Sequence, residues 1–326
     1  MTLINQTTRL ARFLCATTAL AASLALGACG ERSAPTDDNA TGERQRITVV
    51  ATTTVLHDVV RQVAGQDATV VGVMRVGEDP HVYEVRPRDA KTIAAADLVL
   101  ANGFHLEATL GGMIDQVAPD THVELAEAAG IEPLGSETYA GAPDPHIWMD
   151  PMLFTDVVTQ IGESLAGADP VHAQAYRDRA ADYNAKLTTL HDEITAAFDA
   201  VPADQRVIIT SHDAFNYYAK AYGIAVHGVV GISTDAQPTP QQVEALRALV
   251  RDQGVRGLFI ETSTSPTLNN LVKKIADEAG IAIGGTLYSD SLGDRGTPGG
   301  TYLDMMRHNT AVIVAALTAG GGAVPE

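Results

Sequence analysis

The sequence predicts an α/β fold in which two lobes, each built on a parallel sheet, are joined by one long rigid helix. Two observations lead to this prediction. Short apolar, β-branched segments alternate with segments of helical periodicity in both halves of the chain, and that alternation is typical of parallel sheets covered by helices. Between Pro151 and Pro202 the alternation stops, and the apolar residues recur at helical spacing instead.

The first lobe is predicted at residues 47–168, where strand-like segments rich in Val, Ile, Leu and Thr are each followed by a helical segment. The predicted strands span residues 46–51, 67–73 and 98–101. The predicted helices span residues 55–64, 88–96 and 106–117. Because parallel strands need a crossover connection, these helices are expected to cover the faces of the sheet.

The linking helix is predicted at residues 169–201. Asp169 and Pro170 form a favourable helix start, because a short acidic side chain caps free N–H groups and proline fits the first helical position. One apolar face follows, formed by Tyr176, Tyr183, Leu187, Leu190, Ile194 and Phe198. A helix of roughly 30 residues spans ~45 Å, which exceeds the needs of a small domain. We therefore expect it to connect two lobes.

The second lobe is predicted at residues 202–326, where the alternation resumes. The predicted strands span residues 206–210, 224–230, 257–260 and 281–287. The predicted helices span residues 214–222, 240–253, 266–279 and 302–318. This pattern again favours a parallel sheet with helices on its faces.

Residues 1–28 predict a leader that precedes the fold. Arg9 and Arg12 precede an apolar stretch at 13–26, which suits a signal peptide and is shorter than the roughly 20 residues of a membrane-spanning helix. The stretch ends at Leu26-Gly27-Ala28-Cys29, which resembles a bacterial lipobox in which Cys29 carries the lipid. The alternative is an ordinary signal peptide that ends near a cysteine. Residues 29–46 are polar and predict a flexible tether.

Composition narrows the chemistry of the body. The chain has 2 cysteines, and because Cys15 lies in the leader and Cys29 at its end, the body contains no disulfide and no thiolate ligand. The net charge of −18 argues against a nucleic-acid partner or binding to anionic lipid surfaces. An acidic chain suits a protein that concentrates cations, but it is equally typical of secreted proteins. We expect an extracytoplasmic monomer.

One tripeptide occurs twice. Asp79-Pro80-His81 and Asp144-Pro145-His146 share the same order, and each is followed by an apolar and then an aromatic residue. Proline restricts its own backbone and that of the preceding residue, so each histidine is expected on a rigid loop. That rigidity suits a metal ligand.

Two further candidates follow predicted strands of the second lobe. His212 comes directly after the strand at 206–210, and Asp290 after the strand at 281–287. Ligands of open α/β sheets bind at the carboxyl ends of the strands, so His81, His146, His212 and Asp290 are expected to meet in the interlobe cleft, two from each lobe. Three imidazoles and one carboxylate suit tetrahedral zinc and are tolerable for manganese. Because the four residues lie far apart in the sequence, a purely structural role stays open for each histidine.

The other histidines are predicted to be surface or capping residues, with His57 and His227 left open. The chain has 10 histidines, and the surface group comprises His105, His122, His172, His191 and His308.

Four motifs carry a family resemblance, namely residues 77–84, residues 144–151, residues 210–215, and residues 287–293 followed by 298–302. They resemble the metal-specific solute-binding proteins of ABC importers, the zinc and manganese (cluster A-I) family. The resemblance implies a two-lobe fold, an interlobe metal site at the four residues above, and delivery to a permease with a cytoplasmic ATPase. Members of this family are often lipoproteins, so the resemblance also agrees with lipid attachment at Cys29.

The resemblance favours zinc over manganese. Manganese-selective relatives often carry glutamate at the third ligand position, where this chain has His212. However, the His-rich loop of many zinc-specialised relatives is absent, because residues 132–145 contain no histidine. The segments at 231–234 and 300–302 are similar to the branch that handles zinc, manganese or both. We therefore expect zinc first and manganese next.

Supporting residues are predicted next to the ligands. Metal-bound imidazoles usually donate their second N–H to a carboxylate, and Glu261, at the end of the strand at 257–260, is a candidate. Glu84, Asp79 and Asp144 are others, with loop capping as the alternative role. Trp148, two residues from His146 in the sequence, is expected to be a packing residue.

Two other functions remain open from the residues. A zinc hydrolase would keep three protein ligands and an open position for water, whereas four protein ligands favour binding without catalysis. A binding protein for an organic metal chelate would need a large aromatic-lined cleft, but aromatic residues make up only 5% of the chain. Surface adhesion stays open as a side role. We predict a binding protein and not an enzyme.

Overall fold

The structure is a computed structural model that describes residues 46–135 and 141–319. The predicted leader, the lipobox cysteine Cys29 and all of the tether but Arg46 therefore lie outside the described residues. Within the described ranges, no helix combines the length and the apolar character needed to cross a membrane.

The first sheet is parallel and has the strand order β2-β1-β3-β4. Its strands are β1 (Ile47–Ala51), β2 (Ala68–Gly72), β3 (Leu98–Ala101) and β4 (His122–Glu124). The register pairs Val49 with Val70 on one side and with Leu98 on the other. The sequence prediction missed β4, because its three residues include two polar ones and show no apolar run.

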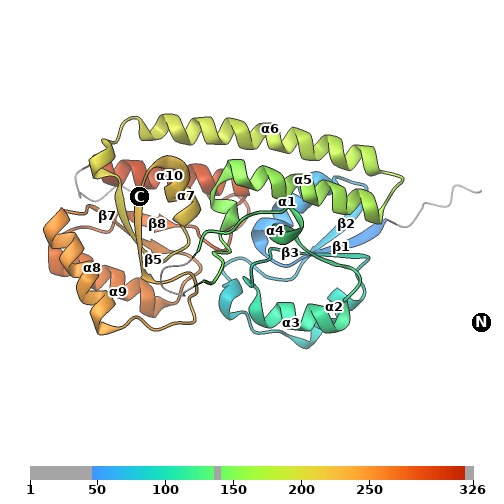
Figure 1. Cartoon of the computed structure of the whole chain (residues 1–326), viewed down its shortest axis with the longest axis horizontal. Coiled ribbons are helices and arrows are strands. Elements are labelled where there is room, and N and C mark those ends of the chain that lie inside the picture. Colours follow the sequence, from blue (N-terminus) through green and yellow to red (C-terminus); the bar gives the residue numbers. More distant parts are fainter. Residues whose placement is uncertain (1–45, 136–140, 320–326) are drawn as a thin grey trace, which may run out of the picture. The chain divides into compact units, whose positions relative to one another are not determined.

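Helices cover this sheet (Figure 1). They are α1 (Thr54–Ala64), α2 (Pro87–Ala94), α3 (Ala108–Val117) and the short α4 (Leu125–Ala128). Single 3₁₀ turns η1 (Pro80–Val82) and η2 (Ile147–Met149) follow the aspartates of the two Asp-Pro-His tripeptides. The repeated tripeptide therefore leads into the same kind of local structure twice.

Two antiparallel helices, α5 (Pro151–Ala168) and α6 (Ala173–Phe198), follow. The sequence prediction placed a helix start at Asp169-Pro170, but α6 begins at Ala173, and α5 was not predicted as a separate helix. Asp169 forms the turn between them, where its Oδ2 lies 2.6 Å from His172 Nδ1 and accepts a hydrogen bond of 3.0 Å from the Tyr176 hydroxyl. Pro170 disfavours helical backbone at Asp169, which ends α5 there.

The second sheet is also parallel, with the order β6-β5-β7-β8. Its strands are β5 (Val207–His212), β6 (Ala225–Val230), β7 (Gly257–Glu261) and β8 (Gly285–Leu287). Its helices are α7 (Asn216–Tyr222), α8 (Pro240–Gln253), α9 (Pro266–Ala279) and α10 (Tyr302–Thr318), and a 3₁₀ turn η3 (Ala203–Gln205) precedes β5. Two parallel-sheet α/β lobes are therefore present, as predicted.

The long helix α6 packs on both lobes (Figure 1). At one end Arg179 donates hydrogen bonds of 2.6 and 2.9 Å to the carbonyls of Val63 and Ala64 at the end of α1. Farther along, Glu193 on α6 pairs with Arg307 on α10 at 2.7 Å. The predicted apolar face of α6 is buried from Tyr176 to Phe198, so one helix ties α1 of the first lobe to α10 of the second.

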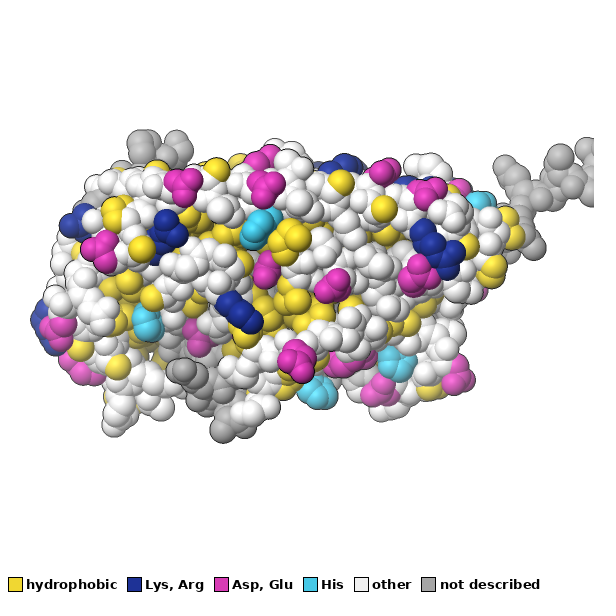
Figure 2. Space-filling model, turned by 45° about the horizontal axis from the view of Figure 1, so that its top comes forward, with side chains coloured by type: hydrophobic (Ala, Val, Ile, Leu, Met, Phe, Trp, Pro, Cys, Tyr) yellow, Lys and Arg dark blue, Asp and Glu magenta, His cyan; other side chains and the backbone are white. Residues whose placement is uncertain are grey.

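The face that carries α6 mixes both charge signs. Figure 2 shows acidic and basic side chains interspersed on this face, without a continuous basic patch in the part drawn in colour. Exposed ion pairs also join α5 and α6, as between Glu163 and Arg177 at 2.7 Å. Nucleic-acid binding needs clustered basic residues, and its absence in this protein stays a prediction.

Candidate metal centre

The four predicted donors come together between the lobes. One ring nitrogen each of His81, His146 and His212 and a carboxylate oxygen of Asp290 all lie within 4.8 Å of one another. In the described part of the chain this is the one group of at least three such residues with that proximity. His146 and His212 are fully buried, Asp290 is 2% exposed, and only His81 is half-buried.

Two of the donors lie at or just after the ends of strands, and the other two lie at 3₁₀ turns. His212 is the last residue of β5, and Asp290 follows β8 by three positions. His81 lies in η1, and His146 immediately precedes η2. Because parallel strands of one sheet end at the same edge, the two sheets present their carboxyl ends to a common space.

The distances within the group suit a small cation. His81 Nε2 lies 3.2 Å from His146 Nε2, and His212 Nε2 lies 3.2 Å from Asp290 Oδ2. His146 Nε2 lies 3.5 Å from Asp290 Oδ1. A tetrahedral site with bonds of about 2.0–2.1 Å separates neighbouring donors by about 3.3 Å. The group therefore has the size of a single coordination shell.

Carboxylates orient two of the three imidazoles. Asp144 Oδ1 lies 2.7 Å from His146 Nδ1, and Glu261 Oε2 lies 2.7 Å from His212 Nδ1. Each carboxylate also accepts a backbone hydrogen bond from its histidine, at 3.0 Å for Asp144 and 2.9 Å for Glu261. Both rings thus direct Nε2 towards the group, which is the usual arrangement around metal-bound histidine.

The third imidazole has a different support. Asp79 accepts a hydrogen bond of 2.9 Å from the backbone N–H of His81, and among the described contacts no hydrogen bond or ion pair joins Asp79 to the His81 ring. Glu84, a further predicted supporting residue, is exposed, and no hydrogen bond or ion pair joins it to the group among the described residues. The prediction for Glu84 was wrong because it follows η1 and its side chain lies at the surface.

Burial and neighbouring charges have opposite effects on the pKa values of His212 and Asp290. Burial lowers the pKa of His81 to about 3, so its imidazole is neutral at physiological pH. Burial alone would also lower the pKa of His212, but Asp290 and Glu261 raise it well above its ordinary value. Burial alone would raise the pKa of Asp290, whereas His212 and the other two imidazoles lower it. The group thus holds an ionised carboxylate where a cation would bind.

Unsatisfied buried atoms also fit a cation. Asp290 Oδ1 and His212 Nε2 are among the buried side-chain atoms that have no hydrogen-bond partner in the described part of the chain. The backbone of Asp290 is fixed by a residue that is not one of the four donors, because its N–H donates a hydrogen bond to Ser263 Oγ at 3.2 Å. Buried polar atoms rarely stay unpaired, so a bound cation would satisfy atoms that the protein leaves free.

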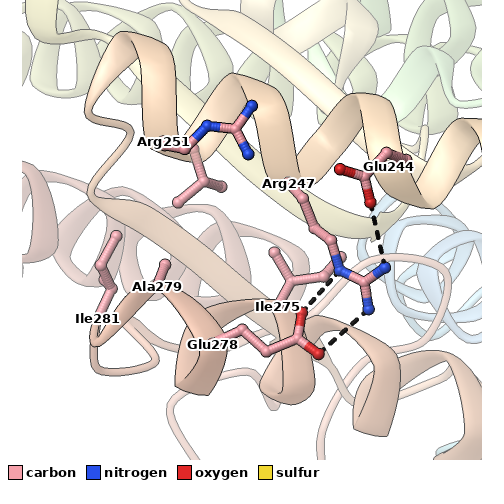
Figure 3. Close-up of a pocket in the computed structure, with 8 residues that line it drawn as sticks. Glu244, Arg247, Arg251, Ile275, Glu278, Ala279 and Ile281 are labelled. Carbon is pink, nitrogen blue, oxygen red and sulfur yellow. Dashed lines mark hydrogen bonds and ion pairs between the residues drawn. The ribbon is translucent and has the colours of Figure 1, made fainter.

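Two other cavities in the described part of the chain contain none of the four donors. A cavity of about 530 Å³ lies between α8 and α9, and the ion pair of Arg247 with Glu278 crosses it (Figure 3). Another, of about 590 Å³, is lined by His57, which was left open above, together with Arg61 and Arg295. Neither cavity gathers several histidines or carboxylates around one point.

Comparison with known proteins decides the family. Residues 49–316 match the family described as zinc-uptake complex component A, periplasmic (ZnuA). The chain belongs to the ZnuA family. The members identified by the comparisons are solute-binding proteins rather than enzymes, which confirms that prediction.

Three ZnuA-family relatives illustrate the match. The manganese-binding lipoprotein MntA of Bacillus subtilis is 34% identical over 301 residues, covering 91% of this chain and 97% of the relative. The structure of the periplasmic zinc-binding protein TroA of Treponema pallidum has 32% identity and a TM-score of 0.79, covering 84% of this chain and 99% of TroA. A manganese-bound periplasmic protein of Candidatus Liberibacter asiaticus has 27% identity and a TM-score of 0.74, covering 83% and 100%.

The fold places further residues beside the proposed ligands. Trp148 packs edge-on against His146, with ring centroids 5.3 Å apart, and its Nε1–H donates to the Ser289 carbonyl at 3.1 Å. Thr234 and Asn216 donate hydrogen bonds to Asp79 and Asp144. The sequence did not indicate the contacts of Thr234 and Asn216, because their partners lie 155 and 72 residues away in the chain.

Proposed function

We propose that this chain captures one zinc ion outside the cytoplasm, with manganese as the next candidate, and delivers it to the permease of an ABC importer that has a cytoplasmic ATPase. The proposed ligands are His81, His146, His212 and Asp290. The observation that carries the proposal is the convergence of these four donors within 4.8 Å in a buried site.

The size of the site supports a bare ion rather than an organic chelate. Pockets for organic ligands commonly enclose about 300–1,000 Å³, whereas donors within 4.8 Å of one another leave room for a single ion. A hydrolase is disfavoured because four protein ligands complete a tetrahedral zinc shell and leave no position for a reactive water. Membership of a solute-binding family argues in the same direction.

The choice of zinc rests on the donor set. Three imidazole nitrogens and one carboxylate oxygen suit tetrahedral zinc. Manganese is the next candidate because Asp290 can supply two donors. Its Oδ1 lies 3.5 Å from His146 Nε2 and its Oδ2 lies 3.2 Å from His212 Nε2. A bidentate carboxylate would therefore add a fifth donor. Relatives named for zinc and for manganese both match this chain.

The experiment is a competitive titration of the metal-free protein with zinc and manganese, read by Trp148 fluorescence. One equivalent of zinc should bind, displace manganese and raise the melting temperature. His81→Ala, His146→Ala and His212→Ala should each weaken binding by more than the roughly 10–100-fold typical of an outer contact. Wild-type binding by all three variants would refute the ligand set, and no thermal shift at saturating metal would refute metal capture. His212→Glu should shift preference towards manganese.

We also propose the arrangement of the chain that this function requires. Residues 1–28 are a cleaved leader, Cys29 carries the lipid, and residues 29–46 are a tether. The first lobe spans 47–168, the linking segment with helix α6 (Ala173–Phe198) spans 169–201 and the second lobe spans 202–326, in a monomer. The names of relatives such as the MntA lipoprotein support the anchor. Cys29→Ser should move the protein from the membrane fraction to the soluble extracytoplasmic fraction, and unchanged membrane retention would contradict lipidation.

A further inference from the structure

The two Asp-Pro-His turns have the same pattern of hydrogen bonds, and each pattern includes the other lobe. In each turn one aspartate oxygen accepts the backbone N–H of its own histidine, at 2.9 Å for Asp79 and 3.0 Å for Asp144. The other oxygen accepts a hydrogen bond from a side chain of the second lobe. Thr234 Oγ1 donates to Asp79 Oδ2 at 2.6 Å, and Asn216 Nδ2 donates to Asp144 Oδ2 at 3.0 Å.

The two turns differ in how they hold the imidazole ring. Asp144 also contacts Nδ1 of His146, so this ring is fixed within its own lobe. The ring of His81 has no carboxylate on its Nδ1 among the described contacts, and His81 is the only proposed ligand that is not fully buried. The position of His81 therefore depends on the backbone of its turn, which Asp79 holds.

A second contact ties the same turn to the second lobe. The backbone N–H of Gly77 donates to Ser291 Oγ at 2.7 Å, and Ser291 is the neighbour of Asp290. Gly77 has φ of +80°, and nothing lies within 4 Å of the position that a Cβ would occupy. The turn at 77–82 is thus held at two points by the second lobe.

We propose that Thr234 is a positioning residue for metal retention, which holds His81 in coordinating geometry through Asp79 only while the two lobes are in contact. This inference rests on the proposed function, because it takes His81 as a ligand. When the lobes separate, Asp79 loses its partner on the second lobe and the turn that carries His81 is released. His81, the partly exposed ligand, is then the first to leave the ion, and its side of the site is the exit path.

The test compares hydroxyl variants within one loop. Thr234→Val removes the donor while keeping the shape, Thr234→Ser keeps the donor, and Ser233→Ala removes a neighbouring hydroxyl that contacts only Asp235, at 2.7 Å. We expect zinc dissociation, followed with an excess of chelator, to become about tenfold faster in Thr234→Val. Thr234→Ser and Ser233→Ala should release zinc like wild type. Thr234→Ala is a second probe if the valine variant folds poorly.

A double-mutant cycle separates this inference from the proposed ligand set. In a His81→Ala background, Thr234→Val should have no further effect on dissociation, because the two residues act through one ligand. If His81→Ala itself binds like wild type, the ligand set fails. If His81→Ala weakens binding but Thr234→Val releases zinc at the wild-type rate, or speeds release equally in both backgrounds, the positioning role of Thr234 is overturned.

Discussion

Glu261 Oε2 lies 2.7 Å from His212 Nδ1, and both side chains are fully buried. Glu261 also accepts the backbone N–H of His212 at 2.9 Å, so one carboxylate fixes both the ring and the main chain of this proposed ligand. Sequence reasoning selected Glu261 only because it ends a strand. The tertiary structure pairs it with a histidine 49 residues away.

Replacing Glu261 by glutamine should weaken zinc binding by about 10–100-fold, the usual cost of losing an outer-shell carboxylate. Glutamine can still accept the backbone N–H, but its amide no longer stabilises the ring with the negative charge that makes the imidazole a stronger donor. Competition against a chelating indicator would measure the change. Glu193→Gln, which removes an exposed carboxylate paired with Arg307, is the control and should bind zinc like wild type. Equal affinities for all three proteins would contradict the role of Glu261.

Zinc binding should release about one proton near neutral pH. Asp290 and Glu261 outweigh burial and raise the pKa of His212 well above its ordinary value, so the metal-free protein holds a proton there that zinc must displace. Affinity should therefore rise about tenfold per pH unit until the pH passes the pKa of metal-free His212. Calorimetry in buffers of different ionisation enthalpy would count the protons. His122→Gln, outside the site, should leave the count unchanged, and a count of zero in the wild type would contradict a protonated His212.

Replacing Glu107 by glutamine should change the pH dependence of stability. Burial raises the pKa of Glu107 to about 7 from an ordinary 4.5, against hydrogen bonds from Thr52 and Asn102. Between these values the folded state holds more protons than the unfolded state, so wild-type stability loses up to about 3 kcal/mol from this group as pH rises. The glutamine variant has no ionisable group at this position, so it does not lose this stability as the pH rises. Its stability relative to wild type, from urea unfolding of metal-free protein, should increase from pH 5 to pH 8.

The exposed Glu84 provides the control for that measurement. Glu84→Gln should track the wild type at both pH values. A constant difference in unfolding free energy between Glu107→Gln and wild type at pH 5 and pH 8 would contradict a raised pKa for Glu107.

Removing the Tyr302 hydroxyl should destabilise the contact between the lobes. This hydroxyl donates to the Trp148 carbonyl at 2.6 Å, and both residues are buried. Tyr302→Phe leaves a buried carbonyl without this partner and should cost about 1–3 kcal/mol of unfolding free energy. The hydroxyl of Tyr183 is buried without any hydrogen-bond partner, so Tyr183→Phe should be neutral or stabilising. Equal losses in the two variants by thermal or urea unfolding would contradict the importance of the Tyr302 bond.

The sequence by itself determined the fold class and the proposed ligands. Alternating strand and helix periods predict parallel sheets, and strand-end positions selected His212 and Asp290 because both features are local in the chain. The repeated Asp-Pro-His tripeptide was equally visible, since proline restricts its neighbours directly. The turn at Asp169 could not be predicted from the sequence, because the same Asp-Pro pair suits both the start of a helix and the end of the helix before it.

Only the tertiary structure decided which acidic and polar residues support the ligands. Glu84 and Glu261 were equal candidates by sequence, but one lies at the surface and the other beside His212. Thr234 meets Asp79 across 155 residues of chain, and Asn216 meets Asp144 across 72. Such contacts form when two separately patterned lobes pack against α6 and against each other, and local periodicity carries no information about that packing.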